Sequence, residues 1–277
     1  MLIREIEQFI DEDLGYNDIS CIVVPNETID ATIFTKEDCT LAGLDVAESF
    51  FDYFDIYAQT EYSNGDDILA GKVIFTLQGS TVSILRAERL VLNFLGHLIG
   101  IATLTRSCVN KVKPLSQVRI ACTRKTTPGI RKFEKMAVVA GGGDAHRFNL
   151  SDSIMLKDNH IKMMGIENAI KSAKKMASFT QKIEVEVEST DDAILAASMG
   201  IDIIMLDNMN SGEVIQTVEM LKRKGLRDSI IIEASGGIDS DNVVEYAKTG
   251  VDVISMGSLI HKAHWIDVSL EFSMSDD

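Results

Sequence analysis

Six short runs of β-branched and apolar residues, separated by segments with helical spacing, are the strongest constraint on the fold of this chain. The runs are VRIA (118–121), IML (154–156), IEVEV (183–187), IDIIML (201–206), SIIIEA (229–234) and DVISM (252–256). The segments between them repeat apolar residues every three or four positions, as in RKFEKMAVVA and SGEVIQTVEMLKRKG. Buried parallel strands that alternate with helices indicate an α/β barrel or a doubly wound sheet. Six strands are few for a complete barrel of eight units.

The first 110 residues follow a different pattern. An N-terminal helix with Ile3, Ile6 and Ile10 on one face precedes two strand-like runs, TIDATIFTK and DILAGKVIFTLQG, and a helix over about 83–110 follows. The apolar window 90–105 is too short for a membrane span and contains Asn93 and His97, so it predicts a buried helix. We therefore predict an α+β domain over 1–111, an α/β domain over 112–263, and a tail, 264–277, that packs with the first domain.

The charge of the chain limits its partners. With a formal net charge of −15 and a pI near 4.8, it lacks the basic surface that nucleic acids or anionic membranes require. Acids occupy the first twenty residues, where a signal peptide would carry basic residues, and the four cysteines show no metal-binding spacing, so we expect a cytoplasmic protein. Residues 119–162, however, hold nine Lys or Arg against four Asp or Glu, which predicts a site for an anionic small molecule.

Polar residues or glycines stand near or directly after the end of each of the six runs, where the carboxyl ends of the strands would lie. The groups are Thr123-Arg124-Lys125, Lys157-Asp158-Asn159-His160, Glu186, Asp207-Asn208, Ser235-Gly236-Gly237 and Met256-Gly257-Ser258. Because the carboxyl ends of parallel strands form the catalytic face of a barrel or open α/β sheet, we predict that these groups converge there. The methionines Met155, Met163 and Met164, by contrast, we expect to serve packing.

The converging groups divide by charge. The cationic set is Arg124, Lys125, Arg147 and Lys157, with His146 beside it, and the anionic set is Glu186 and Asp207. The guanidinium fork of arginine suits carboxylates and phosphates, and two carboxylates near a phosphate-bearing ligand are typical of a magnesium site. Glu184 and Glu188 share the alternation of Glu186, so the pattern alone leaves open which acid faces the site.

Seven ordered stretches then match a known family and cover almost the whole chain. They are DEDLGYNDIS (11–20), AERLVLNFLGHLIGIATLT (87–105), TRKTTPGIRKFEKMAVVAGGGDAHRFNLSDSIMLKDNHI (123–161), VEVES (185–189), IMLDNM (204–209), EASGGI (233–238) and GVDVISMGSLIH (250–261). The chain resembles the quinolinate phosphoribosyltransferases, decarboxylating pentosyltransferases that make nicotinate mononucleotide for NAD biosynthesis. The resemblance implies an open α/β barrel with an N-terminal α+β domain, Mg²⁺ as cofactor, and a homodimer or an assembly of dimers.

The resemblance also implies roles for individual residues. Lys125, Glu186 and Asp207 would act in catalysis on phosphoribosyl pyrophosphate, with Glu186 and Asp207 also serving the magnesium ion. The substrate-binding residues would be Arg89 from the partner subunit, Thr123, Arg124, His146, Arg147, Lys157, Ser235, Gly236, Gly237, Gly257 and His261. Of these, Arg124, Arg147 and Lys157 would hold the two carboxylates of quinolinate.

The sequence departs from the family pattern at two places. Cys122 stands where an Asp commonly precedes the TRKT element, which removes a carboxylate partner for a neighbouring cation. Ile260-His261-Lys262 replaces a THS-like turn, where Lys262 would add a charge at the phosphate end.

Three other functions are weighed beside this one. A paralogous phosphoribosyltransferase of the molybdenum-transport-associated type would act on another ring carboxylate, although the KDNH stretch argues against it. A barrel lyase would use Lys125 or Lys157 as a Schiff-base nucleophile. A non-catalytic metabolite-binding protein would tolerate loss of Glu186 and Asp207.

Overall fold

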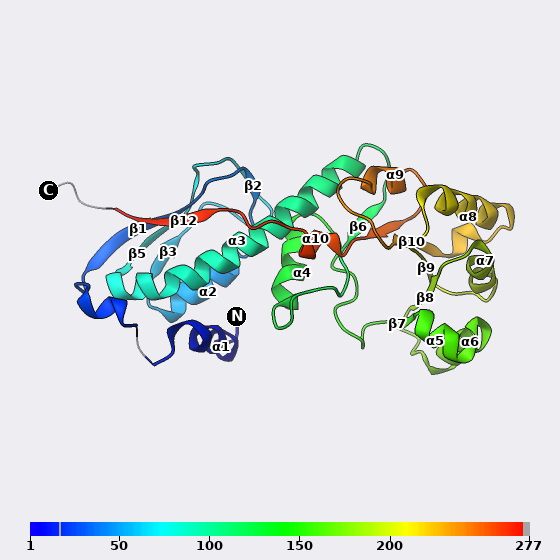
Figure 1. The fold of residues 1–277 in the computed structure, drawn as a ribbon, viewed down its shortest axis with the longest axis horizontal. Coiled ribbons are helices and arrows are strands. Elements are labelled where there is room, and N and C mark those ends of the chain that lie inside the picture. The colour runs from blue at the N-terminus through cyan, green and yellow to red at the C-terminus, as the bar shows by residue number, and fades with distance from the viewer. Residues whose placement is uncertain (17, 274–277) are drawn as a thin grey trace. The chain divides into compact units, whose positions relative to one another are not determined.

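The computed structural model describes residues 1–16 and 18–273, and its contacts divide the chain into two units (Figure 1). The first unit comprises 1–103, 139–142 and the residues from 263 onward, and the second comprises 104–138 and 143–262. The predicted boundary at 111/112 lies at the end of helix α3 (Thr81–Val112), whereas the contacts divide the chain within this helix. A continuous helix contains no turn signal at such a point, so composition does not mark it. Residues 274–277 of the predicted tail lie outside the described residues.

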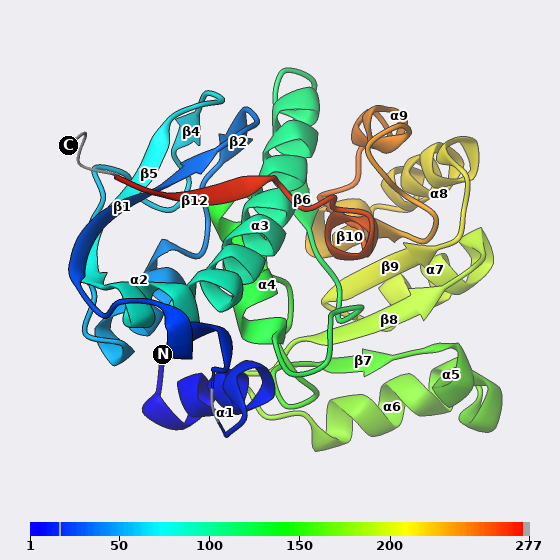
Figure 2. The ribbon, with the colours of Figure 1, turned by 60° about the vertical axis from the view of Figure 1, so that its left-hand side comes forward.

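The first unit contains a four-stranded antiparallel sheet in the order β12-β1-β5-β3. Its strands are β1 (Thr28–Thr35), β3 (Tyr57–Gln59), β5 (Val73–Ser80) and β12 (Val268–Phe272), and β2 (Cys39–Thr40) pairs separately with β4 (Asp67–Ile68). Its helices are α1 (Ile3–Leu14), the 3₁₀ turn Ser20–Val23, α2 (Leu44–Tyr53) and the first part of α3. Strand β12 runs beside β1 (Figure 2), and Ile33 of β1 lies opposite Leu270 of β12. A strand from the C-terminal part of the chain therefore belongs to the sheet of the first unit.

Aromatic side chains form the core of the first unit. Phe51 of α2 packs edge-on against Phe75 of β5, with ring centroids 5.3 Å apart, and Phe94 of α3 lies 4.9 Å from Phe9 of α1. Ile6 and Ile10 of the predicted apolar face of α1 are buried, but Ile3, in its first turn, is exposed.

Helix α3 is long and apolar enough to cross a membrane, but only by length and composition. Its most apolar 18-residue window has a mean hydropathy of 1.3, and 61% of that window is buried inside the protein. Leu95, Leu98 and Ile99 are at most 1% exposed, as the predicted buried helix requires. A core helix passes the same test of length and hydropathy, and burial explains the apolar run here.

The second unit is built on a six-stranded parallel sheet, and all six predicted strands are confirmed. They are β6 (Arg119–Ala121), β7 (Ile154–Leu156), β8 (Ile183–Val187), β9 (Ile203–Asp207), β10 (Ile231–Ser235) and β11 (Val253–Ser255), in the order β6-β11-β10-β9-β8-β7. The helices between and after them are α4 (Arg131–Ala140), α5 (Asp158–Met164), α6 (Ile166–Met176), α7 (Thr190–Ser198), α8 (Ser211–Arg223), the 3₁₀ turn Arg227–Ser229, α9 (Val243–Ala247) and α10 (Ser258–His261). Among the described residues no strand ladder joins β6 to β7, so this is an open α/β barrel.

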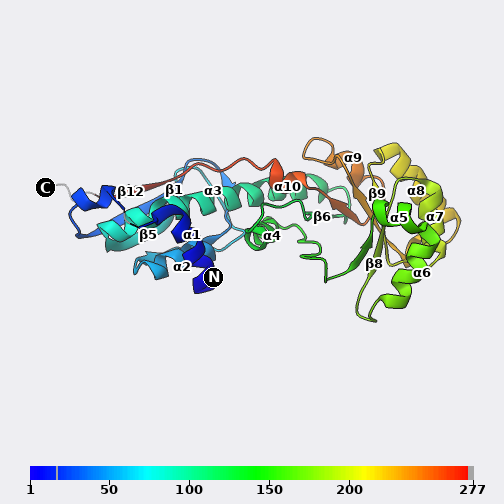
Figure 3. The same ribbon diagram turned by 60° about the horizontal axis from the view of Figure 1, so that its bottom comes forward.

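Alternation along the strands gives the sheet one apolar and one polar face. On the apolar face, Val185, Ile204 and Ile232 are fully buried, and helices α5–α8 lie together on one side of β8 and β9 (Figure 3). The alternate positions along the same strands point to the opposite face, which carries Glu184, Glu186, Met205, Asp207, Glu233 and Ser235. Polar residues at the carboxyl ends of the strands therefore point into the barrel.

Side-chain hydrogen bonds cap the first turns of helices α7 and α8. The Ser189 hydroxyl accepts a hydrogen bond from the Asp192 N–H at the start of α7. Asn210 and Glu213 form a reciprocal capping box at the start of α8. Such caps stabilise a helix by about 0.5–2 kcal/mol and hold its first turn close to the end of the preceding strand.

Candidate active site

A pocket of about 480 Å³ opens at the carboxyl ends of the six strands. Nine of the residues predicted from the sequence line it: Thr123, Arg124, Lys125, His146, Arg147, Lys157, Glu186, Asp207 and Ser235. Met155, Met205, Glu233 and Ser255 complete the lining. The predicted convergence of strand ends is thus present in the structure, and it brings five cationic or ionisable bases and three acids to one cavity.

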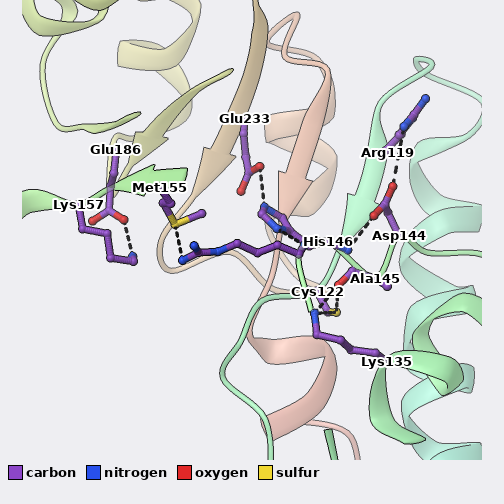
Figure 4. A network of polar contacts seen from close by, with 11 residues as sticks. Arg119, Cys122, Lys135, Asp144, Ala145, His146, Met155, Lys157, Glu186 and Glu233 are labelled. Atoms are coloured by element: carbon purple, nitrogen blue, oxygen red, sulfur yellow. Dashed lines mark hydrogen bonds and ion pairs between the residues drawn. The ribbon is translucent and has the colours of Figure 1, made fainter. Parts of the chain in front are cut away.

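The cations and acids are not segregated within the pocket. The Lys157 Nζ lies 2.6 Å from the Glu186 Oε2, and the Glu186 side chain is only 10% exposed (Figure 4). Of the three acids in the alternation of β8, Glu186 lines the pocket, Glu184 is 1% exposed, and Glu188 is exposed beyond the strand end. The tertiary structure therefore answers the question that the alternation left open.

Asn208 holds the Asp207 carboxylate, and Asn208 packs so closely against residue 236 that only glycine fits there. The Asn208 side-chain N–H donates to the Asp207 Oδ2 at 2.6 Å, and the Asn208 backbone N–H donates to the Ser235 carbonyl at 3.0 Å. Gly236 has a φ of +89°, and a Cβ built there would lie 2.3 Å from the Asn208 Oδ1 and 2.6 Å from its backbone nitrogen. A side chain at 236 would displace Asn208, and with it Asp207.

The pair Glu186 and Asp207 suits a divalent cation. Burial raises the pKa of Asp207, the negative charge of Glu186 raises it further, and the charges of Lys157 and Lys125 oppose the shift. A hard cation between these two carboxylates would offset both unfavourable effects, and carboxylate oxygen is the donor that magnesium prefers.

Of the remaining predicted phosphate-side residues, Gly257 and His261 lie near Lys125. A Cβ at Gly257 would lie 3.0 Å from the Lys125 Cδ and 3.5 Å from the ring of His261, so the absent side chain leaves room for the lysine stem. Gly237 has a φ of +63°, and a Cβ built there would meet no heavy atom within 4 Å apart from its chain neighbours. Gly236, Gly237, Gly257 and His261 lie outside the lining of the pocket itself. Lys262 forms an ion pair with Asp239 at 2.7 Å, which accounts for its charge.

His146 and Arg147 form one wall of the pocket. The Arg147 guanidinium contacts the Met155 Sδ at 3.1 Å and the Ser153 carbonyl at 3.4 Å, and burial lowers the pKa of Arg147. The Arg124 Nε is buried and has no hydrogen-bond partner among the described residues. The packing role expected for the methionines is wrong in part, since Met155 lines the pocket and Met163 and Met164 are exposed.

Arg89 lies on α3 in the first unit, where its side chain is exposed.

Two buried acids, Glu184 and Glu233, are absent from the residues predicted for the site, although Glu184 was noted for sharing the alternation of Glu186. They are 1% and 2% exposed, and Glu233 lies 3.1 Å from the His146 Nε2. A signal for them does exist in the sequence, because each stands two positions before a predicted site residue, Glu186 or Ser235, and therefore on the same face of its strand. An acid within an otherwise apolar strand is the pattern to look for.

The structure also identifies the cation that lacks an acid at position 122. Lys135 is 2% exposed, and its ammonium donates to the Cys122 Sγ at 3.5 Å and to the Ala145 carbonyl (Figure 4). Burial raises the pKa of the Cys122 thiol, and the charge of Lys135 opposes this. Cys122 thus faces a buried lysine, as the Asp common in the family at that position would.

Two family models together match most of the chain. The model of the quinolinate phosphoribosyl transferase N-terminal domain matches residues 18–99, and that of the C-terminal domain matches residues 101–271. The chain belongs to the quinolinate phosphoribosyltransferase family. It is 46% identical to the probable nicotinate-nucleotide pyrophosphorylase [carboxylating] of Methanothermobacter thermautotrophicus, over 96% of this chain and 97% of that one.

Two further relatives of the family span nearly the same length. The probable nicotinate-nucleotide pyrophosphorylase [carboxylating] of Archaeoglobus fulgidus is 48% identical over 93% of this chain and 98% of its own. The solved structure of the nicotinate-nucleotide pyrophosphorylase from Francisella tularensis superposes with a TM-score of 0.91 at 36% identity, and the match covers 98% of this chain and 95% of that one.

Proposed function

We propose that this chain transfers phosphoribosyl from phosphoribosyl pyrophosphate to quinolinate and releases pyrophosphate and carbon dioxide, so that nicotinate mononucleotide forms in NAD biosynthesis. The observation that carries the proposal is the single pocket that joins Arg124, Arg147 and Lys157 to the two acids Glu186 and Asp207. Members of the family named nicotinate-nucleotide pyrophosphorylase match this chain almost end to end, which supports the same activity.

The cationic wall fits a dicarboxylate. Arg124 and Arg147 each present a planar fork that can donate two parallel hydrogen bonds to one carboxylate. The buried Arg124 Nε has no partner among the described residues, so this donor is free for a ligand. Lys157 would leave Glu186 for a substrate carboxylate and thereby release Glu186 for the second substrate.

The opposite wall fits phosphoribosyl pyrophosphate. Lys125, with its stem over Gly257, would contact the pyrophosphate, and the backbone amides of Ser235, Gly236, Gly237 and Gly257 would bind the 5-phosphate. Thr123 lies at the strand end beside these groups, and its hydroxyl accepts from the Lys125 N–H at 3.0 Å. Glu186 and Asp207 would hold Mg²⁺, which when bound offsets the charge of the pyrophosphate leaving group.

The chemistry needs orientation and charge compensation more than a reactive side chain. The pyridine nitrogen forms a bond to C1 of the ribose while the bond from C1 to the pyrophosphate oxygen breaks. The ribose ring carries positive charge as this occurs. Glu186 and Asp207 are close enough to the pocket to stabilise that charge. When the C2 carboxylate departs as carbon dioxide, its bonding electron pair stays on C2, where the positive charge of the now quaternary nitrogen stabilises it, and a proton then adds at C2. Holding both substrates in line is the main contribution of the protein.

Assembly and location complete the proposal. We propose a homodimer in which Arg89 reaches the pocket of the partner subunit, and a cytoplasmic enzyme. Sedimentation of the purified protein, and complementation of an Arg89→Ala protein by a pocket-defective subunit in the same dimer, test the first point.

The activity is tested by mixing the purified protein with quinolinate, phosphoribosyl pyrophosphate and magnesium. We expect nicotinate mononucleotide and carbon dioxide in equal amounts, and far less of both with Glu186→Gln. Folded protein that yields no product from quinolinate, but yields a nucleotide from another ring carboxylate, would contradict the assignment of the substrate. A carbonyl substrate trapped on Lys125 or Lys157 by borohydride would favour a lyase instead.

A further inference from the structure

Glu233 and Glu184 lie in the barrel with His146 in a cluster that the proposed chemistry does not use. Donor and acceptor atoms of the three residues lie within 4.8 Å of one another. Each acid has a carboxylate oxygen, Oε1, that is buried and without a hydrogen-bond partner among the described residues. Burying carboxylates in this way costs free energy, so the arrangement calls for a role that offsets the cost.

Both ring nitrogens of His146 are engaged, and this determines its tautomer. The Nδ1 accepts a hydrogen bond from the Arg147 backbone N–H at 2.7 Å, so in the neutral ring it carries no proton. The proton is therefore on the Nε2, which donates to the Glu233 Oε2 at 3.1 Å. Among the described residues, Glu233 is the acceptor within hydrogen-bond reach of the Nε2.

The same hydrogen bonds hold an unfavourable backbone conformation. His146 has a φ of +53°, in the left-handed region that residues other than glycine rarely adopt. Its backbone N–H donates to the Asp144 Oδ1 at 2.7 Å, so Asp144, Glu233 and Arg147 together fix this turn. The next residue along the chain is Arg147, whose direction into the pocket depends on the turn.

We propose that Glu233 is a positioning residue: it holds His146 as its Nε2–H tautomer, and the Nδ1 of His146 holds the backbone of Arg147, so that the Arg147 guanidinium faces the substrate carboxylate. The identity of that carboxylate rests on the proposed function, whereas the tautomer does not. His146 then differs from its sequence-based role, since both of its ring nitrogens already have hydrogen-bond partners within the protein.

The charges around His146 favour its protonated form, so the neutral tautomer is measured at a pH well above the usual pKa of histidine. Burial lowers the pKa of His146, but the hydrogen bond and charge of Glu233 and the charge of Glu184 raise it, and the net shift is upward, against an opposing charge from Lys135. Glu233 lies on β10, Glu184 on β8 and Lys135 on α4, so two acids and one cation face the ring from three elements.

The first test reads the tautomer without any substrate. In wild-type protein, the ¹⁵N chemical shifts of His146 at pH 8 should show an unprotonated Nδ1 and a protonated Nε2. Glu233→Leu should give a mixture of tautomers, and Glu233→Gln, which keeps an acceptor at the same place, should keep the wild-type form. A wild-type ring with its proton on the Nδ1, or an unchanged tautomer in Glu233→Leu, would overturn the proposal.

The second test separates the two substrates kinetically. Glu233→Leu should raise the KM for quinolinate on the order of tenfold to a hundredfold while the KM for phosphoribosyl pyrophosphate changes less than about twofold. Glu233→Gln should recover most of the loss. If Glu233→Leu does not fold, His146→Asn, which tolerates a positive φ but is too short to reach Glu233, takes its place and should show the same split in KM. Equal effects on both KM values would indicate a general structural role instead.

A matched control comes from elsewhere in the same unit. The Tyr246 hydroxyl donates to the Met209 carbonyl at 3.1 Å in the buried interior. Tyr246→Phe removes a buried hydrogen bond outside the pocket, so it should lower the Tm without changing either KM. Should the protein prove inactive on quinolinate, the ¹⁵N measurement still decides whether Glu233 sets the tautomer.

Discussion

The Lys157 ammonium and the Glu186 carboxylate lie 2.6 Å apart in the pocket, although the family resemblance assigns them to different ligands. Each residue thus neutralises the other until substrates bind. Binding of a dicarboxylate to Lys157 would free Glu186, and binding of a magnesium-bound pyrophosphate to Glu186 would free Lys157. The two half-sites are therefore coupled through one ion pair, which has direct experimental consequences.

Removing the acid should leave the dicarboxylate half-site intact. In Glu186→Gln, Lys157 keeps its charge and no longer has to leave a carboxylate, so we expect quinolinate to bind as tightly as in wild type or tighter, while turnover falls at least about a hundredfold. Calorimetric titration measures the first effect and product formation the second. Lys157→Met, the complementary variant, should lose most quinolinate affinity; if Glu186→Gln loses it as well, the coupling is refuted.

Arg124 should show the difference between charge and geometry. Arg124→Lys keeps the charge but loses the bidentate fork, and Arg124→Ala loses both, so quinolinate affinity should fall in the order wild type, Arg124→Lys, Arg124→Ala. We expect the alanine variant to bind too weakly for titration at millimolar quinolinate. Equal dissociation constants for wild type and Arg124→Ala would remove this residue from the site.

The two neighbouring glycines should respond very differently to alanine. At Gly236 an added Cβ meets the Asn208 side chain and backbone, so Gly236→Ala should lower the free energy of unfolding by about 3 kcal/mol or more. At Gly237 the space is open and the only cost is the positive φ, about 1–2 kcal/mol. Thermal denaturation of both variants checks this order, and a Gly237→Ala protein with the lower Tm would contradict it.

Glu184 predicts a pH dependence of stability. Burial and the charge of Glu233 raise its pKa to about 7, above the 4.5 of an unperturbed glutamate. Between these two pH values the folded protein binds more protons than the unfolded chain, so this residue costs progressively more stability as pH rises from 4.5 to 7 and the full cost persists above. Glu184→Gln should therefore raise the Tm by several degrees at pH 8 and change it little at pH 5. An equal effect at both pH values would argue against a raised pKa.

Cys122 offers a test of the buried lysine. Cys122→Asp would place a carboxylate against the Lys135 ammonium, which contacts the Cys122 thiol and the Ala145 carbonyl. We expect the aspartate variant to be more stable than Cys122→Ala by about 3 kcal/mol or more, because the alanine leaves the buried charge with fewer partners. Urea denaturation of both variants measures the difference, and similar midpoints would show that Lys135 does not depend on residue 122.

Much of the fold is written locally in the chain. The runs at 154–156 and 183–187 coincide with β7 and β8, because short β-branched segments flanked by helical spacing have few other conformations open to them. The polar groups that follow the strands could likewise be placed at one edge of the sheet, since parallel strands share that edge.

The division of the chain within α3 could not be predicted in the same way. It depends on which residues pack against the two parts of the helix, and the helix itself carries no break at that point.

What the sequence alone determined was the set of strands, the helices between them and nine of the residues that line the pocket. Only the tertiary structure decided that Lys157 pairs with Glu186, that Glu184 is buried, and that Glu233 reaches His146. The physical reason is sequence distance: Glu233 and His146 lie 87 positions apart. The burial of a side chain, its ion pair and the position of its proton depend on contacts between residues that are distant in sequence. Local sequence patterns do not contain this information.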